Sequence, residues 1–200
     1  MMTALEQGIL SGITVSLMIG PIFFGLVDLT ITKGWRSGLA YVAGIVVIDI
    51  VLIMLVENLL NRIDFHDIKQ PMGIIGGILL LVFGVVIFMS KASTAHAPIE
   101  DIKTLFQAFV KGIVINVLNP FVTVWWITMY TTFSINYDTI AEKIQFYFGI
   151  LLMVFLFDLV KIRFAYFLKQ KLTIDKLIIV KKIAGMCLFI FGIVMIVRVM

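Results

Sequence analysis

Residues 5–31 read LEQGILSGITVSLMIGPIFFGLVDLTI, an apolar run that is interrupted near its middle by Gly20-Pro21. A second run, residues 106–133 (FQAFVKGIVINVLNPFVTVWWITMYTTF), is interrupted in the same way by Asn119-Pro120. Proline removes a helical hydrogen bond, and inside a lipid bilayer the freed backbone groups find no water. Such a break is tolerated where those groups line a cavity or meet another helix. A pair of breaks in corresponding positions of two halves therefore indicates a binding site of the kind that transporters use.

The composition places the chain in the lipid bilayer. Of its 200 residues, 62% are hydrophobic and 14% are charged, whereas soluble domains are about half apolar and a quarter charged. Too little polar surface remains to cover a water-soluble globule. We therefore predict an all-α integral membrane protein. The net charge of +4 comes without a basic, aromatic-rich block, so no nucleic acid is expected as a partner.

Six apolar runs predict six transmembrane helices. Each holds roughly 18 residues or more, which is what a helix needs to cross ~30 Å of hydrocarbon. The first and the fourth of these helices carry the proline breaks. The runs cover residues 5–31, 39–60, 72–89, 106–133, 144–168 and 177–199.

The two halves of the chain repeat one another. Residues 77–84 (GILLLVFG) match residues 185–192 (GMCLFIFG), and the second and fifth runs each hold one acid, Asp49 and Asp158. Because three helices is an odd number, the halves enter the membrane from opposite sides and form inverted repeats. We predict a single transmembrane domain over residues 1–200, divided into a first repeat over 1–90, a cytoplasmic linker over 91–104 and a second repeat over 105–200.

The basic residues predict the orientation of the chain. Most lysines and arginines fall on the connections around residues 33–36, 91–111 and 161–182. Because basic loops stay on the cytoplasmic side, both termini are predicted to lie outside. The opposite side holds only Arg62, Lys69, Lys143 and Arg198.

Asp49 is the first candidate for coupling transport to an ion. It lies about ten residues, or ~15 Å, into its helix and so near the middle of the bilayer. An aspartate there costs ~2.5–3.5 kcal/mol to insert, and such residues normally serve an ion or substrate path. A desolvated carboxyl favours its neutral form, which suits a proton carrier.

Asp158 is the second candidate, and it has a structural alternative. Lys161 follows three residues later on the same helix face, so the two could form a local ion pair. Asp28 lies nearer the cytoplasmic end of the first helix, at a similar depth to Lys161. We predict a structural or gating ion pair for Asp28 and Lys161.

Groups at the two breaks are candidates for substrate binding. Broken helices expose N–H groups at a positive dipole end and carbonyls at a negative one. The carboxylate and the ammonium of an amino acid match these two ends. Capping of the backbone by asparagine and simple packing of tryptophan are the structural alternatives. The candidates are Gly20, Pro21, Asn116, Asn119, Pro120 and Trp125.

Several motifs follow one another in a characteristic order, namely Gly20-Pro21, Gly34-Trp35-Arg36-Ser37-Gly38, Gly44 with Asp49, Phe109 with Gly112, Asn116-Val117-Leu118-Asn119-Pro120, and Asp158. Together they resemble the LysE/RhtB family of bacterial amino-acid exporters over nearly the whole chain. Ile19 replaces the first proline of the family's first-helix motif, and Phe121 stands where a basic residue often follows. The resemblance implies export of an amino acid or a derivative across the bacterial inner membrane, coupled to protons.

Two other functions stay open at this point. One is export of another small polar metabolite, and the other is an intramembrane aspartyl protease that uses Asp49 and Asp158. The chain lacks the Gly-x-Gly-Asp context of such proteases, so we predict a transporter and not an enzyme. The apolar runs hold no cluster of metal-binding residues, so neither a metal nor a cofactor is expected. A homodimer is left open.

Overall fold

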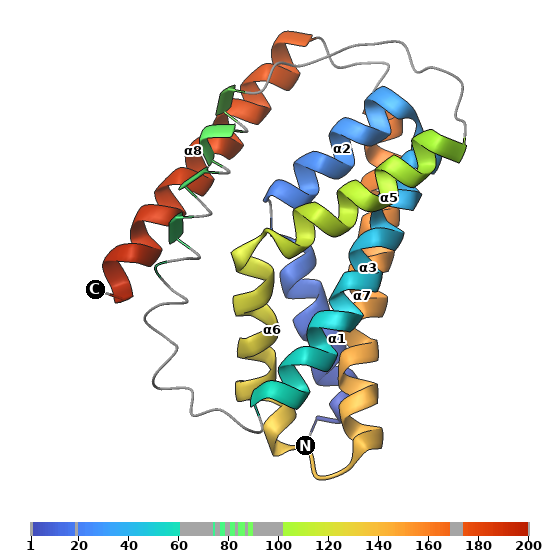
Figure 1. Ribbon diagram of the computed structural model, residues 1–200. Helices are drawn as coiled ribbons and strands as arrows, with labels where there is room; N and C mark the ends of the chain where they lie inside the picture. Colours follow the sequence, from blue (N-terminus) through green and yellow to red (C-terminus); the bar gives the residue numbers. More distant parts are fainter. Residues whose placement is uncertain are drawn as a thin grey trace.

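The computed structural model describes residues 2–18, 20–60, 102–168 and 174–199, together with residues 74, 77, 78, 81, 82, 84–86, 88 and 89. The regular structure of this part is helical throughout (Figure 1). Residues 91–101 of the predicted linker and much of the third predicted helix lie outside it. The elements are α1 (Ala4–Ser16), α2 (Pro21–Lys33), α3 (Trp35–Leu60), α5 (Ile102–Val117), α6 (Pro120–Thr132), the 3-10 helix η1 (Ser134–Asn136), α7 (Ile140–Leu168) and α8 (Ile174–Val199).

The two predicted helix breaks are confirmed. α1 and α2 meet at an angle of 69°, and α5 and α6 meet at 63°. Pro21 and Pro120 each stand at the start of the second helix of the pair. A proline is tolerated there because the first N–H groups of a helix have no partner within the helix. Each broken run is therefore two short helices.

The number of helices that could cross a membrane is lower in the described part than the predicted six. By length and composition, one helix qualifies alone, Trp35–Leu59, and up to three qualify if each bent pair counts as one span. α7 and α8 have 29 and 26 residues. Large apolar side chains such as those of Met54 and Val160 are exposed on the outside of the helices, as contact with lipid requires.

α1 and α7 start at the same end of the molecule, beside the N-terminus (Figure 1). Both begin with a Thr-x-x-Glu capping box, in which the threonine side chain accepts from one backbone N–H and the glutamate side chain accepts from another. The N-cap Thr3 Oγ1 lies 3.3 Å from Glu6 N. The corresponding distance between Thr139 Oγ1 and Glu142 N is 3.2 Å. Capping thus fixes where both helices begin.

Each broken run packs its first half against the long helix of the other half. α1 packs on α7, and α5 packs on α3. A Cβ atom at Gly12 of α1 would lie 2.7 Å from the carbonyl oxygen of Ile150 on α7. One at Gly112 of α5 would overlap the carbonyl oxygen of Tyr41 on α3. Glycine is required at both contacts because the two backbones touch.

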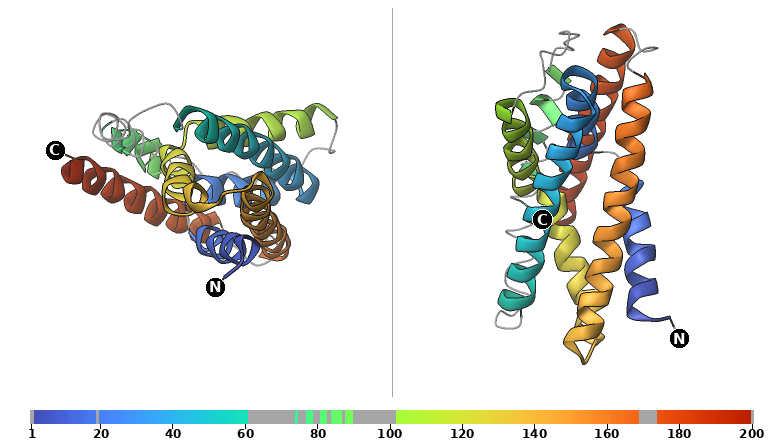
Figure 2. Two further views of the ribbon diagram at one scale, coloured as in Figure 1. Left: turned by 90° about the horizontal axis from the view of Figure 1, so that it is seen from below. Right: turned by 90° about the vertical axis from the view of Figure 1, so that its right-hand side faces the viewer.

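α8 and the described residues of 74–89 lie together at one side of the molecule (Figures 1 and 2). They too meet through glycines. A Cβ atom at Gly84 would lie 2.8 Å from the oxygen of Gly185, and one at Gly192 would lie 2.8 Å from the oxygen of Gly77. The glycines of the two matching motifs are therefore where the described residues of 74–89 contact α8.

Candidate functional site

Asp49 lies where α3 passes the break between α5 and α6. Its carboxylate oxygen Oδ1 accepts two hydrogen bonds, one from Asn116 Nδ2 at 2.8 Å and one from Trp126 Nε1 at 3.0 Å. Asn116 Nδ2 also donates to the carbonyl oxygen of Ile45 at 3.3 Å. Asp49 is 5% exposed and Asn116 is fully buried. One acid thus joins three helices at the break.

The partners of Asp49 are neutral. Hydrogen bonds to a carboxylate are about twice as strong as bonds between neutral groups, so Asn116 and Trp126 stabilise its charged form. Within the described part of the chain, no lysine or arginine forms a salt bridge with Asp49. The acid can therefore lose its charge without leaving a cation unpaired.

Two buried polar atoms on the helices that flank the second break have no hydrogen-bond partner in the described structure, Asn116 Oδ1 on α5 and Trp125 Nε1 on α6. An unpaired buried polar group costs about 1–3 kcal/mol. The first is an acceptor and the second is a donor. The Trp125 ring stacks on Phe121 with 6.4 Å between centroids, whereas the ring of Trp126 reaches Asp49. Both tryptophans follow Pro120 and their rings could line a pocket, but only Trp125 was selected as a substrate-binding candidate, because position in the sequence does not show which ring reaches Asp49.

The two breaks differ in how their backbone is capped. Asn119 is the N-cap of α6, and its Oδ1 accepts from Phe121 N at 3.2 Å. Gly20 is the N-cap of α2 and makes no side-chain cap bond. A Cβ atom at Gly20 would meet nothing within 4 Å. The break at Gly20 therefore leaves backbone N–H groups at the start of α2 next to open space.

Asp158 on α7 forms the local ion pair that its spacing suggested. Its Oδ1 lies 2.8 Å from Lys161 Nζ, and its side chain is 3% exposed. Asp158 interacts electrostatically with Asp49 and with the Tyr41 hydroxyl, which itself donates to the carbonyl oxygen of Ile22 at 3.2 Å. The two predicted acids therefore lie near one another but have different partners.

Asp28 on α2 has a basic neighbour on another helix. Lys111 Nζ of α5 lies 3.9 Å from Asp28 Oδ2. Both side chains are partly exposed, at 44% for Lys111 and 32% for Asp28. Lys161, the other predicted gating residue, pairs with Asp158. Asp28 and Lys161 thus belong to two separate ion pairs.

A polar cluster around Glu57, at the opposite end of α3 from Trp35, was missed by the sequence reasoning. Glu57 Oε2 lies 2.8 Å from Lys143 Nζ, and Oε1 accepts from the Tyr147 hydroxyl at 2.7 Å and from the Ser134 hydroxyl. Lys143 Nζ also lies 5.7 Å from the centroid of the Tyr130 ring. Ser134, Lys143 and Tyr147 are 77 to 90 positions from Glu57 in the chain, so no local pattern could pair them with it.

The described residues hold no group of three histidines, cysteines or acids that could bind a metal ion. Asp49 and Asp158 are each bonded to their own partners, Asn116 and Trp126 for the first and Lys161 for the second. They do not share a proton across a hydrogen bond in the way that a protease dyad does.

The model of one protein family, the LysE type translocator, matches residues 13–198. This span includes both breaks, Asp49 and Asp158. Translocators of this family are multi-pass membrane transporters and not enzymes, which rules out the protease hypothesis. Their cargo is amino acids or similar small solutes. Comparisons with curated proteins and with solved structures found no match. Because the family model covers well over half of the sequence, the chain belongs to the LysE type translocator family.

Proposed function

We propose that this translocator exports an amino acid or an amino-acid derivative across the bacterial inner membrane, coupled to the proton gradient. The observation that carries the proposal is the position of Asp49. It is a buried acid with neutral partners, placed at a helix break where backbone groups and an unpaired amide oxygen lie close by. A transported ammonium and a proton would compete for the same carboxylate.

The proposal includes six transmembrane helices arranged as two inverted repeats, 1–90 and 105–200, in one domain with a cytoplasmic linker over 91–104. The bent pairs support it because they run in opposite directions (Figure 1). The paired glycine contacts of α1 with α7 and of α5 with α3 also support it. The excess of basic residues on one set of loops supports termini that lie outside.

The substrate in this proposal lies between the two breaks. Its carboxylate would be held by the positive helix end that starts at Gly20-Pro21, where the backbone is uncapped. Its ammonium would be held by Asp49 and by the free acceptor Asn116 Oδ1. The unpaired Trp125 Nε1 is a further donor for the carboxylate. Asn119 and Pro120 have a structural role at the second break in this proposal, because the Asn119 side chain already caps α6.

Coupling follows from charge at Asp49. When Asp49 is ionised, its carboxylate attracts the ammonium of the substrate. When a proton arrives from outside and neutralises the carboxylate, Asp49 releases the substrate. Asp158 is a second carboxylate close enough to influence Asp49 electrostatically. For alternating access, one end of the bundle must open at a time. Asp28 with Lys111 at one end and Glu57 with Lys143 at the other are the ion pairs that we assign to the two gates.

The test is transport in proteoliposomes under an imposed pH gradient, first with a panel of labelled amino acids and dipeptides to find the substrate. Asp49→Asn keeps the shape of the side chain but removes its charge and its proton. We expect it to lower gradient-driven flux about 100-fold, the typical effect of losing a proton-transfer group. The matched control is Glu142→Gln, which removes an acid at the start of α7.

Two results would contradict parts of the proposal. Proton-driven flux at the wild-type rate in a folded Asp49→Asn protein would remove this residue from the mechanism. Flux of only non-amino-acid metabolites, with every amino acid inactive, would leave the role of Asp49 standing and overturn the substrate class.

A further inference from the structure

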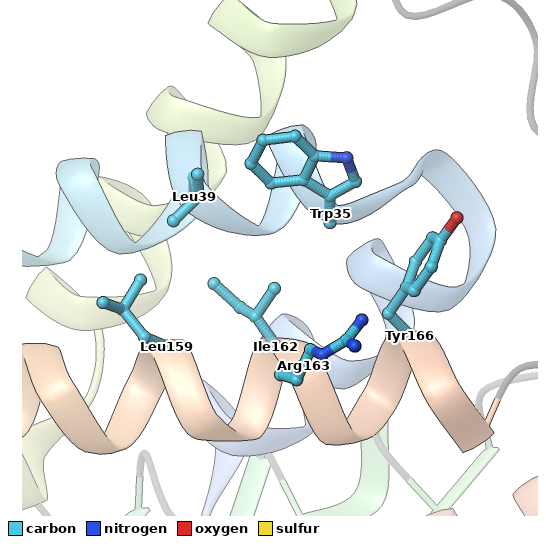
Figure 3. Close-up of a pocket in the computed structure, with 6 residues that line it drawn as sticks. All are labelled: Trp35, Leu39, Leu159, Ile162, Arg163 and Tyr166. Carbon is cyan, nitrogen blue, oxygen red and sulfur yellow. The ribbon is translucent and has the colours of Figure 1, made fainter.

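A pocket lies between the first turn of α3 and the last turns of α7, with a volume of about 350 Å³ (Figure 3). It is separate from the site at Asp49. Trp35 precedes Asp49 by 14 residues on the same helix, which corresponds to ~20 Å along the axis. Six side chains line the pocket, namely Trp35, Leu39, Leu159, Ile162, Arg163 and Tyr166.

The lining of this pocket is divided along the helix axes. Leu39, Leu159 and Ile162 form its apolar part, towards the middle of α3 and α7. Trp35 and Tyr166 lie at the end of the pocket nearer the helix ends, and they are 45% and 42% exposed. Aromatic rings with a polar atom are typical of the level of the lipid headgroups, and aliphatic side chains are typical of the acyl-chain level.

The polar end of the pocket is positively charged. Arg163 lines it, and no acidic residue does. Arg163 forms no salt bridge with an acid in the described part of the chain. A second cation is close, since Arg36 Cζ lies 5.6 Å from the centroid of the Trp35 ring. α3 also begins at Trp35, so the positive end of its dipole points to the same place.

From this arrangement we propose that the pocket binds an anionic phospholipid. The phosphate lies at Arg163 beside the start of α3, and an acyl chain lies along Leu39, Leu159 and Ile162. Charge complementarity selects an anionic headgroup over a zwitterionic one. The apolar part of the pocket selects a lipid over a free phosphate. The bound lipid joins α3 to α7, the two long helices that carry Asp49 and Asp158. The proposal does not depend on the identity of the exported solute.

The first experiment measures lipid binding to the purified full-length protein in detergent by native mass spectrometry. Phosphatidylglycerol and phosphatidylcholine with the same acyl chains are compared. We expect phosphatidylglycerol to bind more tightly, and Arg163→Gln to weaken it about fivefold, the equivalent of ~1 kcal/mol per basic residue near an anionic lipid. Lys103→Gln, which removes one positive charge outside the pocket, is the matched control and should change the affinity less than twofold.

Three results would overturn the proposal. One is equal binding of both lipids, and another is an equal effect of Arg163→Gln and Lys103→Gln. The third is competition by glycerol 3-phosphate, a soluble headgroup without acyl chains, at the same concentration as the lipid. That result would assign the pocket to a free anion.

A second experiment needs no variant and so does not depend on how Arg163→Gln folds. The wild-type protein is labelled with a phosphatidylglycerol that carries a photoreactive group on its acyl chain. We expect the adducts to concentrate on Leu39, Leu159 and Ile162. Adducts spread evenly over the exposed apolar residues of all helices would refute a specific lipid site.

Discussion

Asp49 on α3 and Asp158 on α7 are buried acids on two long helices, each of which packs on the first helix of a broken run, but their surroundings differ. Asp49 accepts hydrogen bonds from Asn116 and Trp126, which belong to the other half and carry no charge. Asp158 is bonded to Lys161, one turn along its own helix. The comparison teaches that two helices with similar packing carry different chemistry. Asp49 has two neutral hydrogen-bond donors, and Asp158 has a lysine ammonium beside it.

The largest effect on stability is expected at Asp158. Asp158→Asn leaves the Lys161 ammonium without its partner, and breaking a buried ion pair costs about 3 kcal/mol. Asp49→Asn should cost far less, because an asparagine oxygen still accepts from Asn116 and Trp126. The free energy of unfolding in detergent with increasing denaturant measures both variants.

A second substitution tests whether the unpaired Lys161 ammonium, rather than the changed side chain at position 158, destabilises the Asp158→Asn protein. Lys161→Gln added to Asp158→Asn removes the unpaired cation and should restore part of the stability. Equal destabilisation by Asp49→Asn and Asp158→Asn would show that the two acids are not distinguished by their partners.

The next effect concerns the two adjacent tryptophans beyond the second break. Trp126→Phe keeps a ring but removes the hydrogen bond from Nε1 to Asp49, which should cost about 2 kcal/mol because the acceptor is charged. Trp125→Phe is the matched control, since Trp125 Nε1 has no partner in the described structure. The stability of the Trp125→Phe protein should change little. In the proposed mechanism, the KM of this variant for the exported solute should rise.

Thermal unfolding and transport kinetics measure these two variants side by side. A loss of stability in Trp125→Phe equal to that in Trp126→Phe would mean that the indole bond to Asp49 contributes nothing. An unchanged KM in Trp125→Phe would remove that indole from the substrate site.

The smallest effect is expected at the caps of the two breaks. Asn119→Ala removes the side-chain bond to the backbone of Phe121 and should cost about 1 kcal/mol, as the loss of an N-cap does. Gly20→Ala should be nearly neutral for stability, because Gly20 makes no cap bond and has space for a Cβ atom. Circular dichroism during denaturation gives both values. A larger loss at Gly20 than at Asn119 would reverse the comparison of the breaks.

Much of the fold could be predicted from local patterns. Composition indicated a membrane protein, and the prolines located both breaks, because proline acts on its own turn of the helix whatever surrounds it. The ion pair of Asp158 with Lys161 was open to prediction for the same reason, since residues three apart share a helix face. The six-helix count, the orientation of the termini and the roles of the site residues stay predictions.

The remainder of the site could not be predicted, because its partners are distant in the chain. Asp49 was singled out as a buried acid, but its bond to Trp126 spans 77 residues. The choice between Trp125 and Trp126 depends on how α6 turns after the break. Glu57 lies near the end of an apolar run, where an acid can simply face water, so nothing in the run itself pointed to its cluster.

The sequence by itself determined that this chain lies in a membrane, that two of its apolar runs break at proline, and that Asp49 and Asp158 lie inside apolar runs. These features follow from hydrophobicity and from the geometry of single turns. Only the tertiary structure decided that Asp49 has neutral donors, Asn116 and Trp126. It also brought Trp35 to Arg163 and formed their pocket. Such contacts depend on how whole helices cross, and glycines such as Gly12 and Gly112 set that crossing by letting backbones touch.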